Sequence, residues 1–217
     1  NAARHQIGIH ARDRRNPQVT LRVHATGICG TDLHVCAWHG QSLDWLGDLL
    51  PVTLGHEFSG TVIKAGPDVE TFHQGDRVTV QSQMACGNCA PCMSALPDQC
   101  HRPGFIGITC DGAFAPRVIV PTDQCWHLPT QVDLELGAIA EPLAVSLNAL
   151  RTGTFEPGQD VLVLGPGMIG MGIAVLASLL GARSVTVAGF GDEPRLARCR
   201  QLGIDHTVDL EHDALVT

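Results

Sequence analysis

The 217-residue sequence predicts two parts of different fold class, a β-rich irregular barrel followed by a parallel α/β sheet. In the first part, residues 19–120, short runs of Val, Ile and Thr are separated by Gly and Pro, as an irregular barrel requires. After Arg151 the pattern becomes strand, helix, strand, helix, strand, which is typical of a parallel sheet. We therefore expect one domain at residues 1–148 and a second at residues 149–217.

The clearest strands of the first part are predicted at residues 21–26, 59–66, 76–82 and 115–121. A run that begins at Leu134 has the period of a helix but contains Pro142, which predicts two helices or a bend. In the second part, apolar strands at 161–164 and 184–189 are each followed by a helix. A third strand is predicted from His206, so that three parallel strands belong to this part.

The composition is that of a globular protein, with 44% hydrophobic and 17% charged residues. The net charge is −8 and no basic run is present, so nucleic acid and anionic membranes are poor partners. The longest apolar run, 167–180, is interrupted by glycine and too short to span a bilayer, and no export signal opens the chain. Nine cysteines, an odd number with four at metal-ligand spacing, favour reduced thiols. We expect a soluble cytoplasmic protein.

Four cysteines form the strongest metal motif in the sequence. Cys86, Cys89, Cys92 and Cys100 have the spacing C-x2-C-x2-C-x7-C. Such turns bring soft sulfur ligands within the reach of one tetrahedral zinc ion. A zinc ion with four protein ligands has no position left for a substrate, so this site is predicted to be structural. Any metal that does chemistry must be bound elsewhere.

A glycine-rich loop predicts a dinucleotide site. The pattern G-x-G-x-x-G lies between a predicted strand and a predicted helix, where its glycines allow a tight turn, a close approach to pyrophosphate and close helix–strand packing. The helix N-terminus then offers N–H groups to the phosphates. A bare structural turn is the alternative, and the strand–loop–helix context favours the nucleotide. The candidate contacts are Gly165, Gly167, Ile169, Gly170 and Arg195.

The choice between NAD and NADP stays open. A carboxylate that would bind the adenosine ribose is missing where the second strand of this part ends, around Gly189. Asp192 follows slightly later and could reach the ribose. Arg195 and Arg198 could instead attract a 2′-phosphate.

A second metal site is predicted from residues that are scattered along the chain. Cys29 and His56 are good zinc ligands, and Glu57 and Glu141 each offer a carboxylate. A catalytic zinc ion needs three protein ligands and one exchangeable position, so Cys29, His56 and one glutamate fit. Taken singly, a buried cysteine or histidine is more often an ordinary core residue. Trp38 and Trp45 are expected to pack a loop or to line a substrate pocket.

The ordered motifs resemble a known family. G-I-C-G-T-D-L-H, G-H-E, the four-cysteine run, E-P-L and G-x-G-x-x-G occur in that order over nearly the whole chain. This combination is similar to the zinc-dependent medium-chain alcohol dehydrogenases, and within them to the threonine, sorbitol and butanediol dehydrogenase branch. The resemblance implies a GroES-like barrel followed by a Rossmann doubly wound sheet that is only partly contained in the chain, and a homo-oligomeric protein.

The resemblance also implies roles for individual residues. Cys29 and His56 would hold a catalytic zinc ion, with Glu57 as a third ligand or close neighbour, and Glu141 would contact the zinc-bound water or replace Glu57. Thr31 would pass the alcohol proton onward, with His34 as the outer end of this relay. The four cysteines would hold a structural zinc ion.

The implied activity is hydride transfer between NAD or NADP and a secondary alcohol, which would be a small polyol, diol or hydroxy-amino acid. The alternative is a truncated or non-catalytic zinc-binding protein of the same fold that does not turn over. A zinc-free quinone reductase of this fold is disfavoured by Cys29, His56 and the four-cysteine run.

Overall fold

The computed structural model describes residues 17–37, 50–204 and 206–213. The chain divides into two compact units, Asn1–Glu141 and Pro142–Thr217. This division falls a few residues before the predicted boundary at 148/149, which lies inside the helix α5 (Ala140–Thr152). Trp38 and Trp45 lie outside the described residues.

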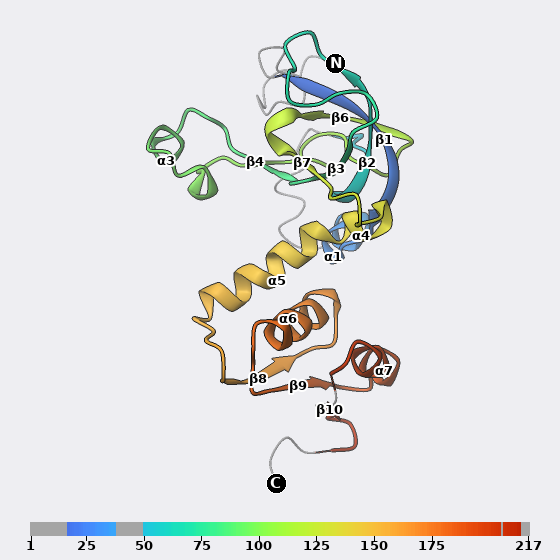
Figure 1. Cartoon of the computed structure of the whole chain (residues 1–217), viewed down its shortest axis with the longest axis vertical. Helices are drawn as coiled ribbons and strands as arrows, with labels where there is room; N and C mark the ends of the chain where they lie inside the picture. The colour runs from blue at the N-terminus through green and yellow to red at the C-terminus, as the bar shows by residue number, and fades with distance from the viewer. Residues whose placement is uncertain (1–16, 38–49, 205, 214–217) are drawn as a thin grey trace. The chain divides into compact units, whose positions relative to one another are not determined.

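The first unit is built on an antiparallel five-stranded sheet with the strand order β6-β1-β2-β3-β7 (Figure 1). Its strands are β1 (Gln18–Gly27), β2 (Glu57–Ala65), β3 (Arg77–Val80), β6 (Arg117–Pro121) and β7 (Cys125–His127). Buried apolar side chains at alternate positions fill one face, among them Leu21, Phe58, Val62, Val78 and Val120. The strands expected from the β-branched runs are therefore present, because one face of each can be buried.

Short elements complete this unit. They are α1 (Gly30–Cys36), β4 (Gln83–Met84), α3 (Ala90–Met93), η3 (Pro97–Gln99), β5 (Gly104–Phe105), η4 (Thr122–Gln124) and α4 (Leu134–Ala138). Strands β4 and β5 form a separate two-stranded ladder. The segment between them carries the four-cysteine run outside the five-stranded sheet (Figure 1).

The β1–β2 ladder brings distant residues together. Gly27, the last residue of β1, is paired with Glu57, the first residue of β2. Cys29 follows the one strand and His56 precedes the other, so both lie at the same end of the ladder. The antiparallel pairing therefore joins two motifs that are separate in the sequence.

The run from Leu134 forms two helices, α4 and α5, as predicted. Pro142 lies in the first turn of α5, where its missing N–H removes no helical hydrogen bond. Glu141 lies in the same turn, where a carboxylate is favoured by the helix dipole. The proline thus starts the second helix and fixes the backbone next to Glu141.

The second unit contains a parallel three-stranded sheet with the order β10-β9-β8. Its elements are β8 (Asp160–Leu164), α6 (Met168–Leu179), β9 (Ser184–Gly189), α7 (Glu193–Gln201) and β10 (His206–Asp209). Helix α6 packs against β8 and β9, and α7 packs against β9 and β10 (Figure 1). Ala174, Ala177, Val187, Leu196 and Cys199 are buried between helices and sheet. The predicted alternation of strands and helices is confirmed.

In the described parts of the chain, no helix has both the length and the apolar character needed to cross a bilayer.

Candidate metal centres and nucleotide loop

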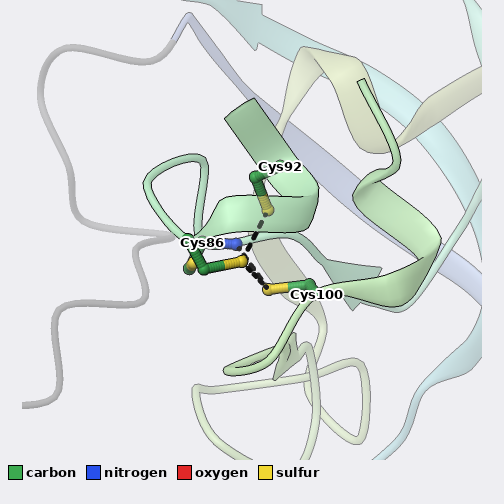
Figure 2. Close-up of side chains that lie close together, drawn as sticks. Cys86, Cys92 and Cys100 are labelled. Carbon is green, nitrogen blue, oxygen red and sulfur yellow. Dashed lines mark hydrogen bonds between the residues drawn. The ribbon is translucent and has the colours of Figure 1, made fainter. Parts of the chain in front are cut away.

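The four cysteines of the predicted structural site meet in space. The sulfur atoms of Cys86, Cys89, Cys92 and Cys100 all lie within 4.8 Å of one another. Figure 2 shows the side chains of Cys86, Cys92 and Cys100 close together. The Sγ atoms of Cys89 and Cys92 are 3.3 Å apart, and those of Cys89 and Cys100 are 3.9 Å apart. Four sulfur ligands at these separations fit a tetrahedral zinc ion.

Backbone N–H groups prepare these sulfurs for negative charge. Cys86 N and Arg102 N donate to Cys100 Sγ at 3.2 and 3.4 Å. Backbone hydrogen bonds from Cys92 and His101 lower the pKa of Cys89 to about 6. Burial, followed by the neighbouring Cys89 thiol, raises the pKa of Cys92 to about 11. Without a metal, a thiolate at Cys89 is therefore favoured and one at Cys92 is disfavoured. A bound dication would allow all four cysteines to be thiolates.

The scattered residues also form a cluster. The ligand atoms of Cys29, His56 and Glu57 lie within 4.8 Å of one another. His56 and Glu57 are buried, and Cys29 is half-buried. One thiol, one imidazole and one carboxylate are all zinc ligands, and three of them leave a coordination position open. The donor set therefore fits a catalytic rather than a structural zinc ion.

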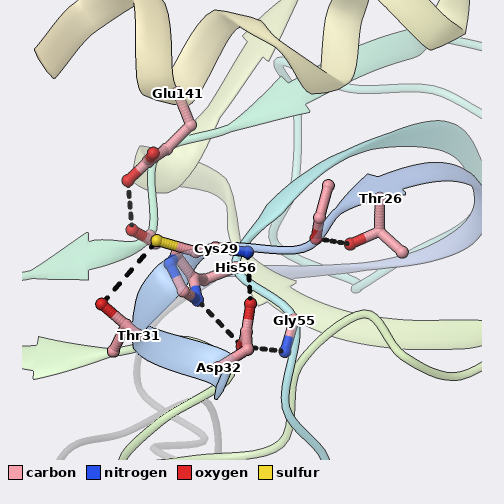
Figure 3. A network of polar contacts seen from close by, with 9 residues as sticks. Thr26, Cys29, Thr31, Asp32, Gly55, His56 and Glu141 are labelled. Carbon is pink, nitrogen blue, oxygen red and sulfur yellow. Dashed lines mark hydrogen bonds and ion pairs between the residues drawn. The ribbon is translucent and has the colours of Figure 1, made fainter. Parts of the chain in front are cut away.

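Asp32 contacts both segments that carry the ligand cluster. It lies in α1, is only 2% exposed, and its Oδ2 accepts a hydrogen bond from Cys29 N at 2.9 Å (Figure 3). Its Oδ1 accepts from Gly55 N at 3.3 Å and lies 3.4 Å from His56 Nδ1. The latter contact is an ion pair whose geometry falls short of a hydrogen bond. With Nδ1 turned to Asp32, Nε2 is the nitrogen left for a metal.

The pKa values of this pair follow from its contacts. Burial opposes the charge of His56, but Asp32 and Cys29 outweigh it and raise the pKa of His56 to about 10. Burial also opposes the charge of Asp32, yet His56 and the N–H groups of Cys29 and Gly55 keep the pKa of Asp32 below its usual range. Without a metal, His56 is an imidazolium at neutral pH, so a metal ion must displace its proton.

Glu57 is the glutamate that belongs to the ligand cluster. Its carboxylate lies against Gly27, where a Cβ atom would meet Glu57 Oε2 at 2.2 Å. A larger residue at this position would force the carboxylate to move from its place beside Cys29. Burial, and then the charge of Glu141, raises the pKa of Glu57. A bound cation would offset both effects.

Glu141 lies next to the cluster without joining it. Among the described residues, its carboxylate is outside the group of ligand atoms that meet within 4.8 Å. It accepts a hydrogen bond from Ser82 Oγ at 3.1 Å and points from α5 toward Cys29 (Figure 3). Of the two glutamates that the sequence leaves open, the geometry favours Glu57 as the ligand and Glu141 as its neighbour.

The two residues of the expected proton relay lie on α1. Thr31 Oγ1 is 3.7 Å from Cys29 Sγ, so its hydroxyl borders the ligand cluster (Figure 3). His34 is exposed and lies three residues further along the helix, on the same side as Thr31. The helix thus places one hydroxyl at the cluster and one imidazole at the surface.

The glycine-rich loop has the predicted strand–loop–helix form. Gly165 follows β8 with a φ of +103°, and Gly167 is the N-cap of α6. A Cβ atom at Gly170 would lie 2.0 Å from Gly165 O, whereas one at Gly167 would meet nothing within 4 Å. Gly170 closes the turn, and Gly167 faces open space next to the helix N-terminus. No side chain caps α6, so its first N–H groups are available to a phosphate.

Arg195 has a partner that the sequence did not reveal. Its Nη1 lies 3.2 Å from Asp192 Oδ1, near the end of β9. Asp209 Oδ1 accepts a hydrogen bond from Gly191 N at 2.8 Å and thereby fixes the turn that follows β9. A carboxylate and a guanidinium group are thus both present where the ribose of a dinucleotide would be expected.

Asp32 and Ser82 belong to the site but are not among the residues predicted to bind metal or cofactor. Asp32 carries a local signal, because an acidic residue three positions after Cys29 can cap the N-terminus of α1. Ser82 carries none, since its partner Glu141 is 59 residues away in the sequence.

Comparisons with known proteins identify the family of the chain. Residues 15–130 match the alcohol dehydrogenase GroES-like domain family. An L-threonine 3-dehydrogenase of Streptomyces coelicolor is 38% identical over 85% of this chain and 53% of its own length. A sorbitol dehydrogenase of Halalkalibacterium halodurans is 37% identical over 89% of this chain and 55% of its own length.

A solved structure extends the similarity to the second unit. A putative zinc-binding dehydrogenase from Sinorhizobium meliloti, bound to NADP, has a TM-score of 0.81 and 35% identity over 88% of this chain and 54% of that one. The chain spans about half the length of the curated relatives that it matches. The β-rich first unit has the GroES-like fold, and the parallel sheet corresponds to part of a Rossmann domain. The chain belongs to the GroES-like alcohol dehydrogenase family.

Proposed function

We propose that the protein carrying this chain is a zinc-dependent oxidoreductase that transfers a hydride between a secondary alcohol and NAD or NADP. The observation that carries the proposal is the meeting of Cys29, His56 and Glu57 at one end of the β1–β2 ladder. A set of three ligands, two of them buried and one half-buried, with a carboxylate that orients the histidine, is the arrangement of a zinc site that keeps one position for substrate.

Each residue has a part in this proposal. Zinc, when bound, supplies Lewis acidity toward an alcohol oxygen, and the nicotinamide accepts the hydride. Cys29, His56 and Glu57 would hold the ion, and Thr31 would take the alcohol proton at Oγ1 while releasing its own toward His34.

The cofactor would lie on the second unit. The N-terminus of α6 and the loop of Gly165, Gly167, Ile169 and Gly170 would receive the pyrophosphate. Arg195 and Asp192 would face the adenosine ribose. The bound NADP of the Sinorhizobium meliloti protein supports a dinucleotide in this fold.

The substrate class is part of the same proposal. The relatives named threonine and sorbitol dehydrogenases favour a small polyol, diol or hydroxy-amino acid. A homo-oligomer is expected as well, and the mass of the native protein in solution measures it.

The test is an assay of the protein with NAD(H) and NADP(H) against threonine, sorbitol and 2,3-butanediol, followed by nicotinamide absorbance. Alcohol-dependent turnover that is lost in Cys29→Ser supports the proposal. Cys36→Ser is the matched control, because Cys36 is an exposed cysteine of the neighbouring helix α1. Absence of turnover with every alcohol and both cofactors would reject the function.

A further inference from the structure

Ser82 is a buried serine whose hydroxyl faces the proposed catalytic site. It lies between β3 and β4 and is only 5% exposed. Its Oγ donates to Glu141 Oε1 at 3.1 Å, which is the contact drawn below Glu141 in Figure 3. A buried hydroxyl needs a partner, and here the partner is a carboxylate beside the ligand cluster.

The backbone around Ser82 is fixed on both sides. Ile106 N donates to Ser82 O at 3.0 Å, and Gln81 N donates to Gln124 O at 2.9 Å. The buried amide of Gln124, with its nitrogen turned to the strand, donates to Gln81 O at 3.1 Å and to Gln83 O at 2.7 Å. Ser82 therefore presents its hydroxyl from a rigid segment, as a positioning group requires.

Glu141 is close to the metal ligands but is held apart from them. Its side chain points from the first turn of α5 toward Cys29 (Figure 3). Its carboxylate is nevertheless outside the cluster of Cys29, His56 and Glu57. The hydrogen bond from Ser82 fixes one carboxylate oxygen of Glu141. The carboxylate can therefore either keep this hydrogen bond or move to bind the metal.

We propose that Ser82 is a positioning residue that keeps Glu141 from joining Cys29, His56 and Glu57 as a fourth protein ligand. This inference rests on the proposed zinc site. A fourth protein ligand would convert an open catalytic site into a closed one, as in the four-cysteine lobe. The hydroxyl of Ser82 thereby preserves the position at which an alcohol enters.

The first experiment uses Co²⁺ bound to the protein, whose visible absorption reports the ligand number. In Ser82→Ala, Glu141 is expected to enter the coordination sphere of the Co²⁺ at Cys29, His56 and Glu57, which is the second metal site. The visible absorption bands of this site then change. Imidazole, a probe for an open position, binds the Co²⁺ about tenfold more weakly than in the wild-type protein. Ser82→Thr, which retains the hydroxyl, keeps the wild-type spectrum.

Two backgrounds show whether the effect acts through Glu141. In Glu141→Gln, the further change Ser82→Ala has no additional effect on the spectrum or on imidazole binding. In Glu57→Gln, which weakens binding of the second metal, Ser82→Ala restores it because Glu141 is released. The control is Ser178→Ala, which removes a hydroxyl bonded to Ala174 O in α6, in the other unit. It leaves both readouts unchanged.

The outcomes separate the two proposals. If the wild-type protein binds no second metal, both the proposed zinc site and the role of Ser82 are rejected. If it binds two metals and Ser82→Ala keeps the wild-type spectrum and imidazole affinity, only the role of Ser82 is overturned. If Ser82→Ala loses the second metal without rescue in the Glu57→Gln background, Ser82 supports the fold instead, and the proposal is overturned as well. Should Ser82→Thr fail to fold, the Glu141→Gln comparison still decides.

Discussion

The two metal clusters of this chain are built in opposite ways. Four cysteines between 86 and 100 come from one segment, and their spacing alone brings the sulfurs together. Cys29, His56 and Glu57 come from two segments that meet only because Gly27 pairs with Glu57 in the β1–β2 ladder. The first cluster is determined by the local sequence, whereas the second is determined by the pairing of two strands in a sheet.

Their surroundings differ in the same sense. The four-cysteine lobe is supported by backbone N–H groups within its own loop, such as those of Cys86 and Arg102. The three-ligand cluster depends on side chains that reach another segment of the chain, since Asp32 contacts His56 and Ser82 contacts Glu141. A closed site can therefore be local, but a site that must stay open needs support from the whole fold.

The largest expected effect is on metal content and turnover. The wild-type protein is expected to bind two zinc ions, while Cys29→Ser and His56→Ala each bind one and lose alcohol-dependent turnover. The reason is that two remaining ligands cannot retain the ion against water. Elemental analysis of dialysed protein measures this. If the wild-type protein and both variants each bind one zinc ion, the proposed catalytic site is contradicted, and the metal is purely structural.

The next largest effect is expected from loss of the four-cysteine site alone. Cys89→Ser is expected to lose the structural zinc ion but to keep Co²⁺ binding at Cys29, His56 and Glu57. Because the lobe is outside the five-stranded sheet, its loss opens the loop and lowers the melting temperature by roughly 5 °C or more. Limited proteolysis locates the opened segment between 86 and 100. Loss of both metals together would show that the two sites are not independent.

The same contrast explains what the sequence could predict. The cysteine spacing predicts that the four sulfurs of the lobe meet, and the glycine pattern predicts the loop before α6, because both depend on near neighbours. The sequence cannot choose between Glu57 and Glu141, since the choice depends on Gly27 leaving space and on Ser82 binding Glu141. These contacts join segments far apart in the chain, and no periodicity records them.

A pH dependence should distinguish the three-ligand cluster. The pKa of His56 is about 10 in the metal-free protein, well above its ordinary value of 6.5, so a metal competes with a proton below pH ~10. Apparent metal affinity at this site should rise about tenfold per pH unit from roughly pH 7 to 9 for this one proton. In the metal-free protein, the His56–Asp32 pair stabilises the fold fully between about pH 4, just above the ordinary pKa of an aspartate, and about pH 6.5. That contribution is lost as the pH rises through about 10.

Titration of Co²⁺ binding at several pH values measures the first effect, and urea unfolding of metal-free protein measures the second. His73→Ala is the matched control, because His73 also lies beside a carboxylate, that of Asp76, but is exposed. A flat metal affinity across this range would show that Asp32 and Cys29 do not hold a proton on His56.

Asp32→Asn tests the support behind His56. It removes the charge that raises the pKa of His56, so the pH profile of metal binding should shift toward the ordinary histidine range. At pH ~11, above the pKa of about 10 that His56 has in the wild-type protein, metal affinity should fall by about tenfold because the ring is less well oriented. Asp76→Asn is the control, since Asp76 also accepts a backbone N–H, that of His73, and lies beside the imidazole of His73, which is exposed and outside the ligand cluster. An unchanged pH profile would remove Asp32 from the site.

The smallest effect concerns the cofactor. Arg195 is paired with Asp192 at the end of β9, on the exposed surface. Arg195→Ala removes a positive charge that would favour a 2′-phosphate and frees a carboxylate that would bind ribose hydroxyls. The ratio of NADP(H) to NAD(H) affinity should therefore fall, by less than about tenfold because the pair is solvated. Fluorescence titration with both cofactors measures the ratio. Arg183→Ala is the control, since Arg183 pairs with Asp160 at the opposite ends of the parallel strands. Equal shifts in the two variants would mean that general charge, rather than the Asp192–Arg195 pair, sets the preference.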